Sequence, residues 1–309
     1  MTRLKKYISF IILVAMVFTL SACKNPAENK KNVAETKKIK ITDIKGRQIE
    51  LEKLPERIVS LSPSNTEIVF ALGAGNKLVG VTSYCDYPEE VKDVEKIGTF
   101  EGPNIEMIKK VQPDVVLAGG YIQEDIITAL ENLNIPVVST EASGFDTIYD
   151  SIALIGKLVG GEDKAEEIIN NMHKTVDDIE SKVRGKEKLN VFYLVWAENL
   201  TTAGKGTFIN DVIKIAGANN IAESVEGWAK YSAEELVKQN PDMIISAYHS
   251  TNEGMSKEDL MRNPLLKNLD CVKKGNIYVM KDDNIISRPG PRIVDAALEM
   301  AKALHGDIF

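Results

Sequence analysis

An amphipathic stripe of 23 residues in the middle of the chain constrains its fold more than any other feature. From Glu162 to Arg184 the apolar residues recur at spacings of three and four, which is the pattern of one face of a helix. The diglycine at 160–161 marks its start. Such a helix would be about 35 Å long at a rise of 1.5 Å per residue. The stripe consists of Ala165, Ile168, Ile169, Met172, Val176, Ile179 and Val183.

Short β-branched runs alternate with helical patterns on both sides of this stripe, and the runs are apolar throughout. Continuous apolar runs of this length are typical of buried strands in parallel sheets. Four runs precede the stripe and three follow it: "RIVSL" (57–61), "LVGV" (78–81), "DVVLA" (114–118), "PVVS" (136–139), "NVFYLVW" (190–196), "DMIIS" (242–246) and "NIYVM" (276–280). We therefore predict an α/β fold with two lobes and parallel-type sheets. The lobes span residues 39–161 and 185–309, and the single long helix at 162–184 joins them.

The two predicted lobes share a construction at a constant offset of 128 residues. Glu106 corresponds to Glu234, and each is followed seven residues later by Pro-Asp and a strand. Phe100 corresponds to Trp228 in the same register. Asn104 and Ser232 also correspond, and both are favourable helix N-caps. A glutamate in the first turn of a helix can simply stabilise the helix dipole. Two at matching positions, however, also suggest a shared role on one rim of the molecule, with the paired aromatics facing the cleft between the lobes.

The beginning of the chain predicts export. A basic start precedes an uncharged apolar segment at 8–20, and Leu20-Ser21-Ala22-Cys23 follows. This segment is too short to span a membrane but fits the core of a signal peptide. Leucine, two small residues and cysteine resemble a bacterial lipobox, which we favour over an ordinary signal peptide. We expect residues 1–22 to be a lipoprotein signal peptide, Cys23 to be lipidated, and the polar segment 23–38 to be a flexible tether. The mature protein would be extracytoplasmic and anchored to the cell membrane by lipid.

Charge and composition exclude several classes of function. The net charge of −7 and a pI near 5.3 give no basic field for nucleic acid. Three scattered histidines offer no metal-ligand spacing, and we predict no metal site. Apart from Cys23, the cysteines are Cys85 and Cys271. A disulfide is one reading of this pair, but they fall in different predicted lobes, so free or buried thiols are favoured.

Signatures of enzymes are largely missing. The chain contains no G-x-S-x-G, H-E-x-x-H or C-x-x-C motif, and "GAGNKLVG" (73–80) does not have the spacing of a dinucleotide-binding turn. Ser64 and Glu67 have the spacing of a capping box, which we interpret as the start of a helix rather than a nucleophile site. The stretch "VTSYCDYPEE" (81–90) leaves three readings open: a nucleophilic Cys85, a metal held by Cys85 with Asp86, or tyrosines that line a pocket. No histidine is near Cys85 in sequence, which disfavours the nucleophile. We predict no catalytic residues.

Large amphipathic side chains are the remaining candidates for the cleft. Aromatic groups offer broad apolar contact with a polar tip, which suits a bulky ligand with a rigid face. Each of them could equally belong to a core, although Trp228 lies in a glycine-flanked polar turn and is the one expected to be exposed. These candidates are Tyr84, Phe100, Tyr121, Trp196, Trp228 and Arg288.

The ordered set of motifs resembles a known family from about residue 39 to the C-terminus. The lipobox, "PERIVSLSPSNTEIVFALG", "GTFEGPNIEMIKKVQPDVVLA", the central helix and "SRPGPRIVDAAL" are similar to the substrate-binding proteins of iron–siderophore, haem and cobalamin ABC importers. "TSYCDYP" is most similar to the cobalamin-binding members, which have a tyrosine at the position of Tyr84. Phe100 departs from them, because a tryptophan is frequent there.

This resemblance implies a helical-hinge periplasmic-binding-protein fold with two Rossmann-like lobes, and no catalysis. It implies a ligand site that includes the loop Asn284, Ile285, Ile286, Ser287 and Arg288, and an aromatic contact from Trp228. It also implies that Glu106 and Glu234 dock on a permease. We expect a monomeric receptor that captures a corrinoid, cobalamin, as its transported ligand and requires no cofactor. A ferric siderophore or haem is the alternative ligand, and an extracytoplasmic enzyme on the same fold is a minor alternative.

Overall fold

Four parallel strands form the centre of the half of the chain that precedes residue 160, here called the N-terminal half. A computed structural model describes residues 38–119, 123–140, 142–247 and 256–309. The strands are β3 (Ile58–Ser60), β4 (Leu78–Val81), β5 (Val115–Gly119) and β6 (Val137–Thr140), in the order β4-β3-β5-β6. Every residue of β3, β5 and β6 is buried, because helices cover both faces of the sheet.

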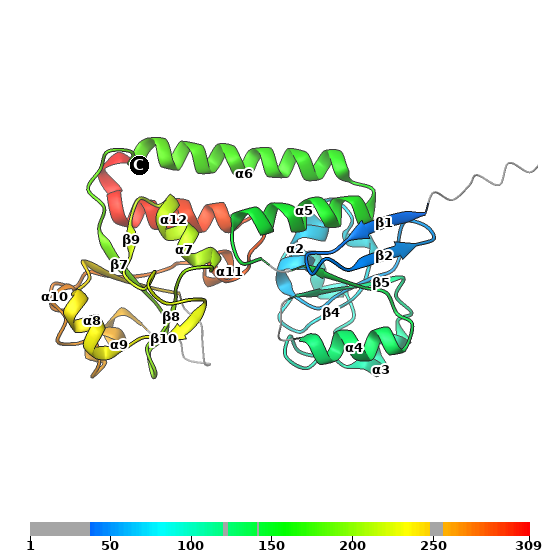
Figure 1. Cartoon of the computed structure of the whole chain (residues 1–309), viewed down its shortest axis with the longest axis horizontal. Coiled ribbons are helices and arrows are strands. Elements are labelled where there is room, and N and C mark those ends of the chain that lie inside the picture. Colours follow the sequence, from blue (N-terminus) through cyan, green and yellow to red (C-terminus); the bar gives the residue numbers. More distant parts are fainter. Residues whose placement is uncertain (1–37, 120–122, 141, 248–255) are drawn as a thin grey trace, which may run out of the picture. The chain divides into compact units, whose positions relative to one another are not determined.

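Successive residues of β5 point to opposite faces and enter two different cores. Val115 and Leu117 belong to the large core that includes α2 (Pro63–Ala71) and α5 (Phe145–Val159). Val116 and Ala118 belong to the core beneath α3 (Ile105–Lys110) and α4 (Glu124–Asn132). Two short 3-10 turns, η1 (Gly75–Lys77) and η2 (Glu89–Asp93), flank β4. A separate antiparallel hairpin, β1 (Ile39–Thr42) and β2 (Gln48–Leu51), precedes the sheet (Figure 1).

A mixed sheet of six strands forms the centre of the C-terminal half, which follows residue 189. Its path is β10-β8-β7-β11-β12, and β9 pairs with β7. Strands β7, β9, β11 and β12 pair in parallel, whereas β8 and β10 form an antiparallel edge. The predicted parallel-type sheets are confirmed, with this edge as an addition. The strands are β7 (Asn190–Trp196), β8 (Thr201–Ala203), β9 (Asn219–Asn220), β10 (Trp228–Lys230), β11 (Met243–Ser246) and β12 (Ile277–Val279).

Helices surround this second sheet. They are α7 (Phe208–Ile215), α8 (Ala233–Gln239), α9 (Lys257–Arg262), α10 (Asp270–Lys273), α11 (Asp283–Ser287) and α12 (Ile293–His305), with a final 3-10 turn η4 (Gly306–Ile308). Two details differ from the sequence interpretation. Residues 284–288 are not a loop, because Asp282 caps a short helix there and accepts a hydrogen bond from Asn284 N. Trp228 begins an edge strand rather than lying in a turn, and it is exposed as expected.

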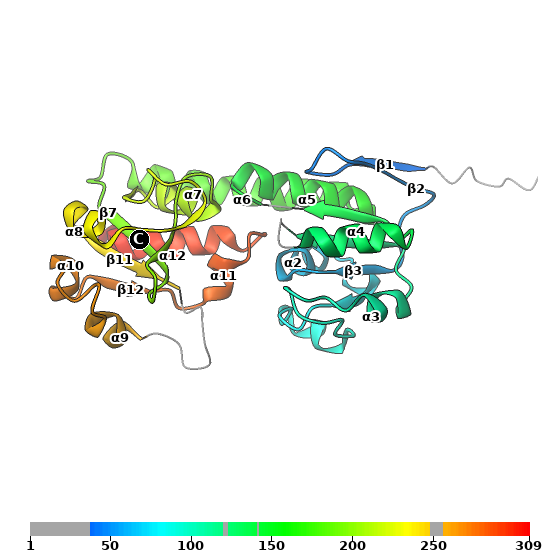
Figure 2. The same cartoon turned by 60° about the horizontal axis from the view of Figure 1, so that its bottom comes forward.

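The long helix is present as α6 (Glu162–Val183), one residue shorter than predicted. Its buried positions are Ala165, Met172, Ile179 and Val183, all members of the predicted stripe. The helix contacts α5 of the N-terminal half and α7 and α12 of the C-terminal half, and both views show it beside α5 and α12 (Figures 1 and 2). No helix of the described residues is long and apolar enough to cross a membrane.

Glycine sets the approach between α5 and α6. A Cβ placed on Gly156 would lie 2.6 Å from the Cβ of Ala165, so only glycine allows the two helices to pack this closely. The chain then turns through Gly160, which has a φ of 75° and ends α5 in a left-handed conformation. The diglycine therefore does mark the start of the long helix.

The repeated construction is visible in both halves. Asn104 caps α3 by accepting from Met107 N, and Ser232 caps α8 by accepting from Glu235 N. Asp114 accepts from the backbone of Arg57 at 2.9 Å, and Asp242 accepts from Asn190 N at 2.8 Å. Each aspartate thus ties the start of one strand to the neighbouring strand. The capping predicted for both helices is confirmed.

Candidate functional site

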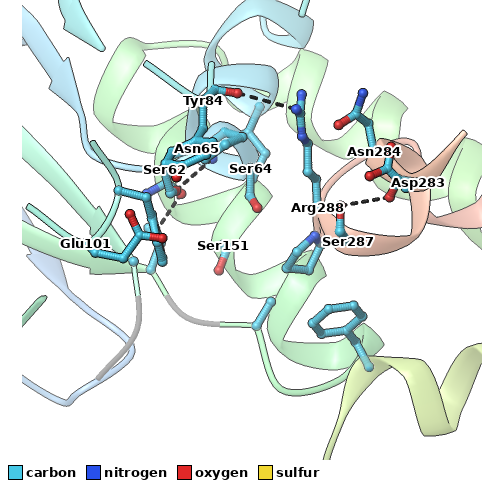
Figure 3. Close-up of a pocket in the computed structure, with 18 of the residues that line it drawn as sticks. Ser62, Ser64, Asn65, Tyr84, Glu101, Ser151, Asp283, Asn284, Ser287 and Arg288 are labelled. Atoms are coloured by element: carbon cyan, nitrogen blue, oxygen red, sulfur yellow. Dashed lines mark hydrogen bonds between the residues drawn. The ribbon is translucent and has the colours of Figure 1, made fainter. Parts of the chain in front are cut away.

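A cavity of about 700 Å³ is lined by residues of both halves. Tyr84 and Glu101 face Asn284 and Arg288 across it (Figure 3). The described residues that line it are Ser62, Pro63, Ser64, Asn65, Ile68, Tyr84, Phe100, Glu101, Gly119, Thr140, Ala142, Ser151, Trp196, Phe208, Trp228, Asp283, Asn284, Ser287, Arg288 and Pro289. This volume lies within the range of small-molecule and cofactor sites.

Large aromatic side chains on the cavity wall are unusually open. Tyr84 is 50% exposed, Trp196 42% and Trp228 52%. Folding normally buries most of the surface of such side chains, so several exposed ones around one cavity indicate a surface kept for a ligand. Trp228 packs against Phe208, which also lines the cavity, with ring centroids 5.5 Å apart in an edge-to-face arrangement.

Buried polar groups hold the loops that carry Tyr84 and Phe100. The Cys85 thiol is buried and lies within hydrogen-bond distance of the hydroxyls of Thr66 and Thr82. Cys85 therefore anchors the loop beside Tyr84 from the core side. Gln123 is fully buried and donates to the carbonyl oxygens of Leu61 and Phe100, which fixes the second loop.

The start of α2 forms part of the cavity wall. Its N-cap is Ser62, whose hydroxyl accepts from Asn65 N, and Pro63 occupies the first helical turn. The prediction that Ser64 and Glu67 form a capping box is wrong, because the cap lies two residues earlier. Proline is favoured just inside a helix start, so Pro63 was the sequence signal for this cap. Ser64 and Asn65 instead lie on the cavity wall.

Arg288 carries the positive charge of the cavity wall, and carboxylates surround it. Its Nη1 lies 2.6 Å from Asp86 Oδ1 and 3.1 Å from Glu67 Oε1. Its Nη2 also donates to the carbonyl oxygen of Tyr84. Burial alone would lower the pKa of Arg288, but the hydrogen bonds and charges of Asp86 and Glu67 outweigh it and raise the pKa above its usual value. The guanidinium remains charged and is largely neutralised by its partners.

The net electrostatic character of the wall is acidic. Among the described residues that line the cavity, Glu101 and Asp283 are acidic, and Arg288 is the sole basic residue. Since Arg288 is already paired, the cavity offers acceptors more readily than it offers free positive charge. It therefore disfavours strongly anionic ligands.

The structure brings together most of the residues predicted to bind a ligand. Tyr84, Phe100, Trp196, Trp228, Asn284, Ser287 and Arg288 all line the cavity. Ile285 and Ile286 do not, because they are buried in the core at 9% and 0% exposure on the inner side of α11. Tyr121 and Cys23 lie outside the described residues.

The two glutamates predicted to dock on a permease lie away from the cavity. Glu106 and Glu234 are exposed in the first turns of α3 and α8. Within the described part of the chain neither carboxylate pairs with a basic side chain. Both are therefore available to an external partner.

The carboxylates that bind Arg288 or line the cavity were not predicted from the sequence. Glu67 and Asp86 hold Arg288, and Glu101 and Asp283 line the wall, yet none of them was predicted to belong to the site. No single-sequence pattern relates Glu67 to Arg288, which is 221 residues away. Among the described residues, no group of three or more His, Cys, Asp or Glu side chains could hold a metal ion.

Two α/β halves that share an aromatic cavity define a ligand-binding protein, and comparison with known proteins identifies its family. The sequence model described as "Periplasmic binding protein" matches residues 58–284. The chain belongs to this periplasmic binding protein family. It is a substrate-binding protein of an ABC transporter, in a family that is not enzymatic.

The individual relatives that follow cover 80% to 96% of the chain. An uncharacterized ABC transporter substrate-binding lipoprotein of Bacillus subtilis (strain 168) is 34% identical over 96% of both chains. A vitamin B12-binding protein of Salmonella paratyphi A is 31% identical over 80% of this chain and 90% of its own. A crystal structure of a possible iron-binding, periplasmic solute-binding protein from Staphylococcus epidermidis has 32% identity and a TM-score of 0.71, and it covers 82% of this chain and 100% of its own.

Proposed function

We propose that this protein captures a corrinoid, cobalamin, in the cavity between its two halves and delivers it to an ABC importer permease. The observation that carries the proposal is the placement of aromatic surfaces from both halves around one cavity of about 700 Å³. Tyr84 and Phe100 come from the N-terminal half, and Trp196 and Trp228 come from the C-terminal half. Opposed aromatic walls suit a large, flat and rigid ligand.

The charges of the wall favour a corrinoid over its competitors. A corrin ring carries carboxamide groups, whose N–H groups can donate to Glu101 and whose carbonyl oxygens can accept from serine and asparagine side chains. A ferric tris-catecholate carries several negative charges, and haem carries two carboxylates. Both would need free cationic partners, but Arg288 is already shared between Asp86 and Glu67.

Haem has a second requirement. A protein normally holds its iron through a histidine, cysteine, methionine or tyrosine. Of the described residues that line the cavity, Tyr84 is the one side chain of these types. A tyrosine that also forms the aromatic wall favours stacking over ligation. A ferric siderophore of the uncharged hydroxamate class is the principal competing ligand, in keeping with the iron-binding description of the relative from Staphylococcus epidermidis.

The remaining parts of the chain complete the proposal. Residues 1–22 act as a lipoprotein signal peptide, Cys23 carries the lipid, and residues 23–38 tether a monomeric extracytoplasmic receptor. Residues 39–161 and 185–309 act as two lobes, and the helix at 162–184 acts as a stiff hinge that permits modest closure. Contacts of α6 with α5, α7 and α12 support this role. Glu106 and Glu234 dock on the permease, with their exposure as support.

Titration calorimetry with defined ligands tests the choice of ligand. We expect cyanocobalamin to bind with a Kd at or below about 1 μM, or about −8 kcal/mol. Haemin and a ferric tricatecholate should bind at least ~100-fold more weakly, because their negative charges meet no free cationic side chain in the cavity. A ~100-fold loss of affinity corresponds to about 2.7 kcal/mol of binding free energy. Tight binding of a ferric trihydroxamate without binding of cyanocobalamin would transfer the proposal to the siderophore.

A cavity variant and a matched surface variant localise the ligand. Trp228→Ala should weaken cyanocobalamin binding by about 1–3 kcal/mol if the indole is a central anchor. Leu133→Ala truncates another exposed apolar side chain, which does not line the cavity, and should leave the affinity unchanged. Equal affinities for the two variants would place the ligand elsewhere.

A further inference from the structure

Glu67 is a buried carboxylate that does not line the cavity. It lies on α2 of the N-terminal half, and it is 4% exposed. Arg292 Nε donates to its Oε2 at 2.8 Å, and Arg292 Nη2 donates to its Oε1 at 2.7 Å. Arg288 Nη1 adds a third bond to Oε1 at 3.1 Å. A bidentate guanidinium with a second arginine is among the strongest arrangements for holding a carboxylate.

Both arginines belong to the C-terminal half. Arg288 follows α11, and Arg292 is the N-cap of α12. Helix α12 is fixed in that half by contacts with α7 and by the hydrogen bond from Tyr278 of β12 to Glu299. The bonds to Glu67 therefore connect the two halves, and the two arginines lie 221 and 225 residues after Glu67 in the sequence.

The bond between Glu67 and Arg288 also helps to position a residue of the cavity wall. Arg288 lines the cavity, whereas Glu67 lies behind it. Tyr87 of the N-terminal half lies against Arg292, with the guanidinium carbon 3.9 Å from the ring centroid. Loss of Glu67 would leave Arg288 with the exposed Asp86 and Arg292 with Asp282 of its own half, 3.5 Å away. Arg292 would then lose its ion pair with the N-terminal half, and Arg288 would lose its buried partner.

We propose that Glu67 is a positioning residue that fixes Arg288 in the cavity wall and holds the two halves in the arrangement that accepts the ligand. The location of the ligand rests on the proposed function, whereas the connection between the halves does not. Asp86 is the closer partner of Arg288 at 2.6 Å, but its carboxylate is 60% exposed, so water and salt screen this bond more than they screen the bonds to the buried Glu67.

A distance measurement without ligand tests the connection. Spin labels at Lys110 and Lys238, both exposed and one in each half, report the separation of the halves in the full chain with Cys23→Ala. The remaining cysteines, Cys85 and Cys271, are buried. In Glu67→Gln we expect a broader distance distribution with a new population at longer distance. Glu56→Gln is the matched control, because Glu56 pairs with Lys77 within the N-terminal half, and it should leave the distribution unchanged.

Ligand affinity provides the second readout. Glu67→Gln should weaken cyanocobalamin binding about tenfold, and Asp86→Asn should weaken it less. Arg292→Lys keeps the charge but loses the bidentate bond, so it should broaden the distances as well and serves if Glu67→Gln does not fold. A Glu67→Gln protein that folds and keeps the parental distance distribution overturns the proposal. If the parent itself does not bind cobalamin, the proposed ligand fails, and the distances still decide the role of Glu67.

Discussion

The carboxylate of Asp211 accepts a hydrogen bond from the backbone N–H of Phe145 at 3.2 Å. Asp211 lies on α7 of the C-terminal half, and Phe145 begins α5 of the N-terminal half. This contact is a further polar connection between the halves, beside those that Arg288 and Arg292 make. It differs from the Glu67 connection, because a carboxylate meets a helix N-terminus rather than a cationic side chain.

Asp211→Asn should stabilise the protein at neutral pH. Burial raises the pKa of Asp211, against the opposing hydrogen bond from Phe145, so the folded state favours the protonated form. The contribution of Asp211 to stability is therefore complete below about pH 3.8, which is the ordinary pKa of the group. It is lost as the pH rises through the higher pKa that Asp211 has in the folded state. Thermal melts should show a higher Tm for the variant at pH 7 and no difference at pH 3. Asp178→Asn, at an exposed site of α6, should show neither effect. A lower Tm for Asp211→Asn at pH 7 would show that burial of the charged carboxylate does not outweigh its hydrogen bond from Phe145.

Replacement of both Glu106 and Glu234 by glutamine should abolish delivery and spare capture. The side chains are exposed and away from the cavity, so cyanocobalamin affinity should stay within about twofold of the parent, or about 0.4 kcal/mol. Transport and stimulated ATPase activity in vesicles with the permease should be lost, and each single variant should show a partial defect. Glu258→Gln changes another exposed first-turn glutamate and controls for the helix-dipole effect. Full transport by the double variant excludes the docking role.

Gly156→Ala should destabilise the packing of α5 on α6. The added Cβ would lie 2.6 Å from that of Ala165, and overpacking of this kind costs about 1–3 kcal/mol. This cost exceeds the roughly 1 kcal/mol that alanine gains over glycine within a helix. Urea unfolding measures the difference, and Gly306→Ala is the matched control because its Cβ would meet no atom within 4 Å. Equal destabilisation by both variants would show that backbone conformation, not helix contact, decides the effect.

Cys23→Ala should release the protein from membranes. If Cys23 carries diacylglycerol, its removal leaves no site for the anchor, and the variant should move to the aqueous phase in detergent partitioning. Lys24→Ala, which changes the adjacent residue, should remain with the detergent. Mass spectrometry that finds diacylglycerol on the Cys23→Ala protein would refute the assignment.

The sequence pattern was sufficient for those parts of the fold that repeat at regular spacing. The stripe from Ala165 to Val183 predicted α6 because a helix must bury one face, and the apolar runs predicted β3, β5 and β11 because parallel strands are covered on both faces. The 128-residue offset located the caps at Asn104 and Ser232. Each of these features depends on neighbours in sequence.

The features that depend on distant partners could not be predicted in the same way. Glu67 has a spacing that fits a capping box, but its true partners lie more than 200 residues away. Ile285 and Ile286 lie beside residues that line the cavity, and only the formation of α11 turns them into the core. The family resemblance pointed to residues 284–288, of which Asn284, Ser287 and Arg288 line the cavity, yet it could not separate one face of that short helix from the other.

Burial of Glu67 predicts that the proposed capture and the proposed delivery respond differently to ionic strength. At an ionic strength of about 0.1 M, dissolved ions largely screen the interaction between exposed charges that are more than about 10 Å apart. They screen buried pairs far less. The bonds from Arg288 and Arg292 to a carboxylate that is 4% exposed are therefore insulated from the surrounding medium. The exposed glutamates of α3 and α8 have no such protection. We therefore expect the proposed ligand site to keep its arrangement as the salt concentration changes, and the proposed docking through these glutamates to weaken as salt is added.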